Sequence, residues 1–301
     1  MRILEWVGGV STNSPARFAT EILVVIEDSS LGFQKILAPV PVVLFAKLPV
    51  PGKVKTRLAA RVGTEQAAIG ARALLLASLR RFSEIPGAPL FLAGDHQRAA
   101  AFDSYPILGK RYLWQGEGDL GSRLTRVFAA PPRIPEEAPA PGVIAIGADA
   151  PHLNPAVIRA AADTVRQGNF ALGPATDGGF YLLGVPCGAV DLAALFPSSG
   201  WGEPGVLART RRVLFEASSP PNAATGPSSE TQWRRTLEFG NLCDIDTWED
   251  LVQLRRDWLA EESAGGPGRS CDSASPLKAE SFEGLRSAAP ELWEFAREAV
   301  D

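Results

Sequence analysis

The stretch Gly142-Val-Ile-Ala-Ile-Gly-Ala-Asp149 decides the fold of this 301-residue chain. Its apolar run shows no alternation with polar residues, which is typical of a strand buried on both faces of a sheet. A helical pattern follows over 155–166, so strand and helix form the beginning of a βαβ unit. Asp149 then lies at the carboxyl end of a strand, where open α/β sheets bind their ligands.

The same alternation extends in both directions from this stretch. Further strands are predicted over 41–46, 89–93, 112–114, 170–173, 180–185 and 236–242, and helices over 64–82, 119–129, 203–217 and 247–261. Strands alternating with helices predict an α/β fold, a three-layer αβα sandwich around a mostly parallel central sheet. We therefore expect the chemistry in the loops after Ala46, Trp114 and Gly147, which share the carboxyl edge of that sheet.

Three regions of the chain differ in character. Residues 41–261 carry the alternating pattern and form the predicted domain, and residues 1–40 are an N-terminal extension of mixed composition. Residues 262–301 combine a flexible linker rich in Ser, Ala, Gly and Pro with a short helix at about 290–300. Trp293 and Phe295 are the expected docking residues of that helix.

Composition excludes several classes of function. A net charge of -4 argues against binding to nucleic acid, which needs a concentrated basic surface. The three cysteines have the spacing of neither a disulfide framework nor a zinc site, and indicate reduced thiols in the cytoplasm. The sequence shows no secretory signal and no apolar run long enough to span a bilayer, so we expect a cytoplasmic protein without membrane insertion.

The loop after the strand at 41–46 is basic. Four cations fall within eleven positions, and three residues turn or stiffen the backbone between them: Lys47, Lys53, Lys55 and Arg57, with Pro49, Pro51 and Gly52. The cations are able to converge on phosphate oxygens, although the spacing is not that of a P-loop. A solvated basic loop explains the same composition equally well.

The loop after the strand at 112–114 is rich in glycine and opens a helix. Gly116, Gly118 and Gly121 leave backbone N–H groups exposed at a helix start, which suits an anion or the edge of a base. A plain glycine turn with Asp119 as helix cap is the alternative interpretation.

Three further aspartates follow predicted strands. Asp149 is a hard oxygen ligand for Mg²⁺ or Mn²⁺, and its alternative is a turn residue capping the next helix. Asp177 lies in Thr176-Asp-Gly-Gly-Phe180, which is a hairpin signal in its own right. Asp246 precedes Thr247 and Asp250, which resemble a helix N-cap, and the second interpretation makes Asp246 a metal ligand beside Asp149.

Five segments in this order resemble a bacterial family of GT-A-fold glycosyltransferases that look like cofactor guanylyltransferases, some of them associated with arsenosugar biosynthesis. The segments are Phe45 to Leu58, Gln115 to Arg123, Ile146 to Leu153, Gly173 to Gly184 and Asp244 to Leu251. The resemblance covers about 41–260 and implies a GT-A (nucleotide-diphospho-sugar transferase) fold. Trp201-Gly-Glu203 departs from the family's W-S-T, and Trp248 replaces its usual proline.

The resemblance also implies a role for each candidate residue. It places Lys47, Lys53, Lys55 and Arg57 on the donor phosphates, Asp177 towards the acceptor, and Asp149 and Asp246 as ligands of Mg²⁺ or Mn²⁺. The catalytic candidates are Lys55 and Arg57, which would stabilise the developing charge, and Asp177, which would act as general base. The residues expected to bind the nucleotide are Lys47, Gly52, Lys53, Gly116, Gly118, Asp119 and Gly121.

Three functions are compatible with these roles. The first is metal-dependent transfer of a sugar from a nucleotide-diphosphate sugar to a small acceptor. The second moves a nucleoside monophosphate from a nucleoside triphosphate to a phosphorylated acceptor and releases pyrophosphate. The third is a nucleotide sensor without catalysis, which the pairing of two metal-ligand candidates with a basic loop makes the weakest.

Overall fold

The computed structural model describes residues 25–26, 35–36, 38–106, 111–132, 139–203, 205–218, 234–263 and 285–300. The chain divides into two compact units, Met1–Ile36 and Leu37–Asp301. In the first unit, β1 (Val25–Ile26) pairs antiparallel with β2 (Lys35–Ile36). Most of the predicted linker at 262–290 lies outside the described residues.

The second unit is built on a seven-stranded sheet with the order β5-β4-β3-β6-β8-β7-β9. The strands are β3 (Val42–Ala46), β4 (Leu90–Gly94), β5 (Tyr112–Trp114), β6 (Gly142–Gly147), β7 (Phe170–Pro174), β8 (Phe180–Pro186) and β9 (Thr236–Glu238). Only the pairs of β8 with β6 and with β7 are antiparallel, which confirms a mostly parallel sheet. The last strand is shorter than its prediction over 236–242.

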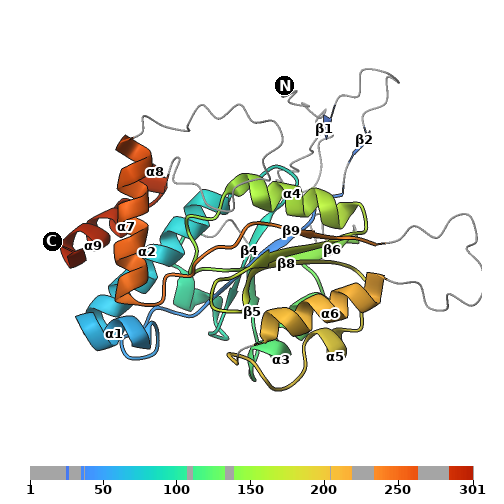
Figure 1. The fold of residues 1–301 in the computed structure, drawn as a ribbon, viewed down its shortest axis with the longest axis horizontal. Helices are drawn as coiled ribbons and strands as arrows, with labels where there is room; N and C mark the ends of the chain where they lie inside the picture. The colour runs from blue at the N-terminus through green and yellow to red at the C-terminus, as the bar shows by residue number, and fades with distance from the viewer. Residues whose placement is uncertain are drawn as a thin grey trace, which may run out of the picture. The chain divides into compact units, whose positions relative to one another are not determined.

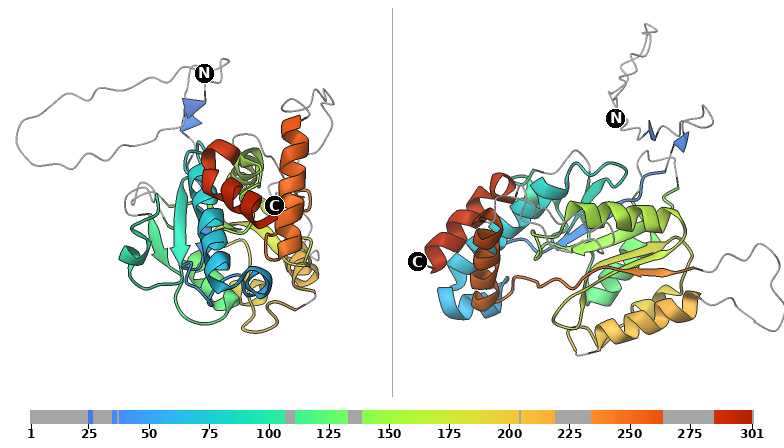
Figure 2. Two further views of the ribbon diagram at one scale, coloured as in Figure 1. Left: turned by 90° about the vertical axis from the view of Figure 1, so that its left-hand side faces the viewer. Right: turned by 45° about the horizontal axis from the view of Figure 1, so that its top comes forward.

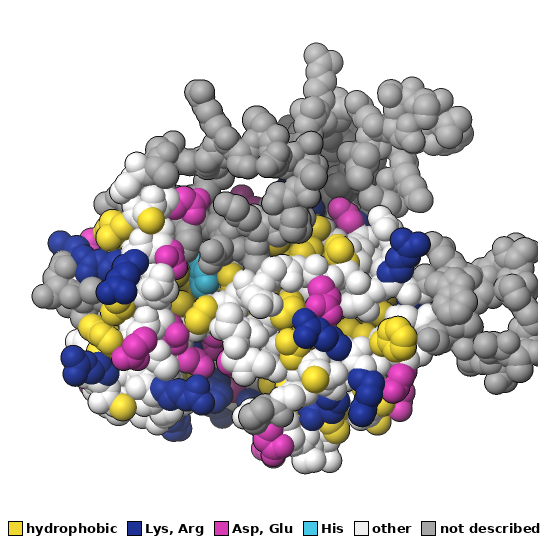
Figure 3. All heavy atoms as spheres, viewed as in Figure 1, with side chains coloured by type: hydrophobic (Ala, Val, Ile, Leu, Met, Phe, Trp, Pro, Cys, Tyr) yellow, Lys and Arg dark blue, Asp and Glu magenta, His cyan; other side chains and the backbone are white. Residues whose placement is uncertain are grey.

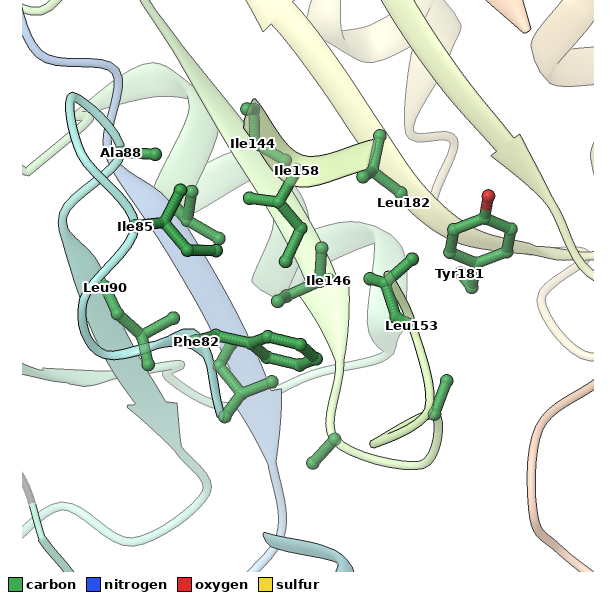
Figure 4. Packing of buried hydrophobic residues seen from close by; sticks show 14 of the residues in the cluster. Phe82, Ile85, Ala88, Leu90, Ile144, Ile146, Leu153, Ile158, Tyr181 and Leu182 are labelled. Carbon is green, nitrogen blue, oxygen red and sulfur yellow. The ribbon is translucent and has the colours of Figure 1, made fainter. Parts of the chain in front are cut away.

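Helices cover both faces of this sheet, so the predicted three-layer arrangement is confirmed (Figure 1). α2 (Thr64–Phe82) and α4 (Pro155–Arg166) contribute to the core on one face, and Figure 4 shows Phe82 and Ile158 directed at Ile144 and Ile146 of β6. The opposite face carries α3 (Leu120–Ala129), α5 (Leu192–Leu195) and α6 (Val206–Ser218).

A third group of helices packs beyond the end of the sheet (Figure 2). It consists of α1 (Thr56–Val62), α7 (Trp248–Ser263), α8 (Leu285–Ala288) and α9 (Pro290–Val300), together with α2. The helix expected at about 290–300 is therefore present, with Phe295 buried against α2. None of the described helices is long and apolar enough to cross a membrane.

Two short elements were not predicted from the sequence. They are α1 and the 3₁₀ turn η1 (Ala99–Phe102). α2 begins at Thr64, as predicted, although α1 ends only two residues earlier. Gly63, at φ 85°, ends α1 and also precedes α2, so Thr64 is the first helical residue.

His152 gives the fold a pH-dependent stability. Its burial, with the nearby positive charge of Arg81, lowers the pKa of His152 from 6.5 to about 4. Below pH 6.5, His152 binds a proton in the unfolded chain but stays neutral in the folded protein. The stabilisation that the neutral His152 gives the folded state is therefore full above pH 6.5 and is lost as the pH falls towards 4. We expect the unfolding free energy, measured in urea, to fall by about 3 kcal/mol more in the wild type than in His152→Gln between pH 7 and pH 4. Parallel pH profiles would contradict this expectation.

Candidate functional site

A cavity of about 610 Å³ opens at the carboxyl ends of β3 and β6. Three loops, after β3, β5 and β6, contribute to its wall, which is the arrangement predicted from the strand pattern. The polar and charged residues that line it are Lys47, Lys55, Thr56, Arg57, Gln115, Asp119, Arg123, Asp149 and Asp246. Figure 3 shows basic and acidic side chains gathered over the same end of the molecule as α1 and α7.

Lys55 joins two aspartates from distant parts of the chain. Its Nζ lies 2.7 Å from Oδ1 of Asp149 and 2.7 Å from Oδ1 of Asp246. The Lys55 side chain is only 6% exposed, whereas those of Asp149 and Asp246 are 48% and 42% exposed. The ammonium group is thus buried beneath two carboxylates that face the solvent.

The charge on Lys55 is secured by these partners. Burial alone opposes the charged form, but the Asp149 and Asp246 carboxylates outweigh it, so the pKa of Lys55 is raised. Lys55 also has left-handed backbone angles, φ 47° and ψ 48°, directly before α1. A non-glycine residue in this region is strained and persists only where its surroundings fix it. The two carboxylates therefore favour the charged form of Lys55, and the backbone holds it in one geometry.

Backbone and cap hydrogen bonds fix the two aspartates. The Ala148 N–H donates to the Phe45 carbonyl at 3.2 Å, and the Ile245 N–H donates to the Asp149 carbonyl at 2.9 Å. Asp250 Oδ2 accepts from the N–H groups of Asp246 and Thr247 at 3.0 and 2.7 Å. The N-cap interpretation of Thr247 and Asp250 is thus correct, and it leaves the Asp246 carboxylate available to Lys55.

The basic loop contributes unequally to the cavity. Lys47 and Arg57 line its wall, and Arg57 does so from the first turn of α1. Lys53 is exposed and is not among the lining residues. Gly52, at φ 77° with open space around it, makes the turn that brings Lys55 inward. Of the loop's cations, Lys47, Lys55 and Arg57 line the cavity, and their convergence on phosphate oxygens stays a prediction.

The glycine-rich loop has a mixed role. Gly118 and Asp119 line the cavity, and Asp119 also caps α3 by accepting from the Ser122 N–H at 2.8 Å. Gly116 has φ 80°, in the left-handed region that favours glycine. Gly121 is required by packing, because a Cβ there would lie 2.3 Å from Trp201 Nε1 and 2.5 Å from the Pro197 carbonyl oxygen. These two glycines shape the loop rather than line the cavity.

Gln115 is a buried connection that the sequence analysis did not single out. Its Nε2 donates to the carbonyls of Ala46 and Ala93, at the ends of β3 and β4, at 2.9 and 2.6 Å. Its Oε1 accepts from Arg123 Nη1 at 3.2 Å. The Gln115 amide therefore links the ends of two strands to Arg123, a cation that lines the cavity.

Replacing Gln115 by leucine is expected to destabilise the fold by about 2–3 kcal/mol, because two buried carbonyls lose their donor. Urea unfolding at pH 7 measures this cost. Gln167→Leu, at an exposed position, is the matched control and should stay within about 0.5 kcal/mol of the wild type. Equal losses in the two variants would show that the Gln115 amide contributes no buried hydrogen bonding.

Asp177 and Asp244 lie at the edge of the site. Asp177 is exposed at the tip of the β7–β8 hairpin, and its Oδ1 accepts from the Gly179 N–H at 2.9 Å. It is not among the cavity-lining residues, and the hairpin interpretation is correct. Burial and the charges of Asp149, Asp177 and Asp246 raise the pKa of Asp244 to about 7. Asp244 was missed as a site residue, although its two-residue spacing from Asp246 in an extended segment was a usable signal.

The donor set fits one kind of metal site. Asp149 Oδ1 and Asp246 Oδ1 contact the same ammonium group, so both can reach a common point. Among the residues that the structure describes, no group of three or more His, Cys, Asp or Glu side chains is arranged to hold a metal ion. Mg²⁺ is typically held by one or two carboxylates together with substrate phosphates. The residues therefore fit an ion that binds together with phosphates, and not a cage made by protein alone.

Comparisons with known proteins agree with the resemblance found in the sequence. Residues 79–203 match the family described as "Uncharacterized protein conserved in bacteria (DUF2064)". This segment contains Asp149 and Asp177 but not Lys55 or Asp246. A comparison with curated proteins finds no match.

Among solved structures, a putative nucleotide-diphospho-sugar transferase from Desulfovibrio desulfuricans G20 has a TM-score of 0.61 and 21% identity, covering 87% of this chain and 98% of that chain. This likeness confirms the predicted fold. Rv0371c from Mycobacterium tuberculosis H37Rv, solved in complex with manganese, has a TM-score of 0.38 and 20% identity over 72% of this chain and 97% of that chain. The inositol-1-phosphate CTP transferase from T. maritima has a TM-score of 0.40 and 11% identity over 77% and 99%.

Proposed function

We propose that this protein is a metal-dependent transferase that moves a sugar from a nucleotide-diphosphate sugar to a small acceptor. The observation that carries the proposal is the cavity at the carboxyl edge of the sheet, where Lys55 bridges Asp149 and Asp246. Two further cations, Lys47 and Arg57, line the same wall. Cations beside a pair of carboxylates suit a diphosphate bound together with a divalent ion.

In this proposal, different residues bind the donor phosphates, stabilise the leaving group and hold the metal ion. Lys47 and Arg57 hold the phosphate oxygens, and Lys55 stabilises the negative charge that develops on the leaving diphosphate. Asp149 and Asp246 would hold Mg²⁺ or Mn²⁺, which supplies Lewis-acid stabilisation of that same leaving group. The segment containing Gly118 and Asp119 lies along the cavity wall on the β5 side, where the nucleoside would bind.

The acceptor side lies towards the β7–β8 hairpin. Asp177 is our candidate general base for an acceptor hydroxyl, because it is exposed and lies close enough to Asp244 for their charges to interact. The carboxylates of Asp177, Asp149 and Asp246 act together on Asp244. This concentration of negative charge favours an uncharged hydroxyl over a phosphate as acceptor.

A second candidate function is nucleotidyl transfer, favoured by the density of cations in the loop from Lys47 to Arg57. In that reaction an acceptor phosphate attacks the α-phosphorus of a nucleoside triphosphate, and pyrophosphate leaves. The same residues would act by positioning and charge neutralisation.

The products separate the two reactions. The purified protein is incubated with Mn²⁺ or Mg²⁺ and either nucleotide-diphosphate sugars or nucleoside triphosphates, with small polyol and phosphorylated acceptors. We expect acceptor-dependent release of nucleoside diphosphate from a nucleotide sugar. Release of pyrophosphate from a triphosphate would contradict sugar transfer and support the second candidate. Binding of nucleotides without either product would support the nucleotide sensor.

A further inference from the structure

The helices beyond the end of the sheet share one apolar core. Its buried members are separate from the two cores on the sheet faces and come from α1, α2, α7, α8, α9 and the segment before α7. They include Leu58, Leu74, Ile245, Leu254, Trp258, Leu285, Leu292 and Phe295. The helices at the C-terminus are thus part of the same packed body as α1, which begins at the candidate site.

Two aromatic contacts seat α9 in this core. The ring of Phe295 lies over Gly70 of α2 so closely that a Cβ at Gly70 would be 2.7 Å from it. Trp293 packs edge-on against Trp258 of α7, with ring centroids 4.9 Å apart. α9 therefore contacts both α2, which contributes Ala71 and Leu75 to the cavity wall, and α7, which follows the Asp246 segment.

The same core reaches the site through two neighbours of its charged residues. Leu58, 1% exposed, lies on α1 three residues after Lys55. Ile245, 2% exposed, precedes Asp246 directly, and its N–H donates to the Asp149 carbonyl at 2.9 Å. The two side chains thereby tie the Lys55 and Asp246 segments to a single packed body.

We propose that α8 and α9 are a positioning element for the site, in which Phe295, by packing against Gly70, keeps Lys55 Nζ between Asp149 and Asp246. Phe295 is a positioning residue that acts through Leu58 and Ile245. The strained backbone of Lys55 needs such support, because a left-handed non-glycine residue relaxes when its surroundings loosen. The consequence for catalysis rests on the proposed function, whereas the placement of Lys55 does not.

The test compares Phe295→Ala with Phe170→Ala in the full chain. Phe170 is fully buried at the start of β7, in the core on the sheet face that faces away from α2, so its loss removes the same side chain without touching α9. Acetylation of Lys55 by an amine-reactive ester, followed by mass spectrometry, reports how well Lys55 is covered without any nucleotide. Titration calorimetry with a nucleoside diphosphate and Mn²⁺ measures the affinity of the site for nucleotide, at a temperature where both variants are folded.

We expect Phe295→Ala to accelerate acetylation of Lys55 and to weaken nucleotide binding, each by about tenfold. Phe170→Ala should leave both within about twofold, even if it lowers the melting temperature as much. Phe295→Leu, which refills most of the space, should restore both properties. If Phe295→Ala does not fold, Trp293→Ala removes a half-buried contact of the same helix and should show the same acetylation change.

Equal acetylation rates in the Phe295 and Phe170 variants would overturn the proposal. A change in Lys55 acetylation without nucleotide binding by any variant, the wild type included, would support the positioning role and contradict the proposed function.

Discussion

Asp149→Asn is expected to reduce transfer by about 10²–10³-fold, the cost of losing one principal electrostatic contact to the reacting group. The asparagine keeps the shape of the side chain but lacks the charge that pairs with Lys55 and that we propose holds a divalent ion. Because the Asp149 side chain is 48% exposed, we expect the variant to fold normally. The measurement is the steady-state rate of nucleoside diphosphate release with saturating Mn²⁺.

The control for this variant is Asp103→Asn. Asp103 is an exposed aspartate after η1, outside the cavity lining, and its amide variant should keep the wild-type rate. Asp246→Asn should resemble Asp149→Asn, because both carboxylates contact the same Lys55 nitrogen. A double variant should then lose much less than the product of the two single losses, as residues that act together are not additive. Normal turnover in Asp149→Asn would exclude the assigned role.

Lys55→Met is expected to produce the second large effect, a loss of about 10²-fold or more in transfer, because the cation proposed to stabilise the leaving diphosphate is gone. The methionine fills most of the space of the lysine stem, so the buried region around α1 stays packed. Lys53→Met is the matched control: Lys53 belongs to the same loop, but it is exposed and is not among the cavity-lining residues.

We also expect Lys55→Met to bind a divalent ion more tightly than the wild type does, although it transfers more slowly. Without the ammonium group, the carboxylates of Asp149 and Asp246 face each other without a neutralising partner, so a divalent ion binds there more favourably. In the absence of nucleotide, Mn²⁺ should raise the melting temperature of Lys55→Met more than that of the wild type. Identical Mn²⁺ responses in the two proteins would show that the ion does not bind between these carboxylates.

The sheet and its covering helices were predictable from the sequence because their signals are local. The run from Gly142 to Gly147 is apolar without a break, and the helix after Asn154 has its cap and a proline at its start. Asp149 follows the strand directly, so its place at the edge of the sheet needed no tertiary information. The strand predicted over 236–242 was too long, because β9 ends at Glu238. The residues after it form one isolated bridge, between Leu242 and Ala175.

The centre of the site was only partly predictable. In the sequence, Lys55 was one of four cations in a loop. Its central place in the site comes from its left-handed backbone angles and from its contacts with Asp149 and Asp246, which lie 94 and 191 positions away in the chain. Gln115 looked like the start of a glycine motif, and its role comes from the carbonyls that two other strands bring to it. Gly121 was expected to bind nucleotide, which stays a prediction, and the close approach of Trp201 gives it in addition a packing role that no local pattern shows.

We propose that Asp149, Asp246 and Lys55 bind the phosphates of a nucleotide together with a divalent ion. The test of this binding is the melting temperature of the wild type and of Asp149→Asn, measured across a panel of nucleoside diphosphates, triphosphates and nucleotide sugars, with and without Mn²⁺. At a concentration 100-fold above Kd, a ligand adds about 2.7 kcal/mol of stability. We expect at least one nucleotide to stabilise the wild type in the presence of Mn²⁺ and Asp149→Asn to lose this gain. If no nucleotide raises the melting temperature in either condition, or if Asp149→Asn responds as the wild type does, these residues do not bind a nucleotide together with a divalent ion.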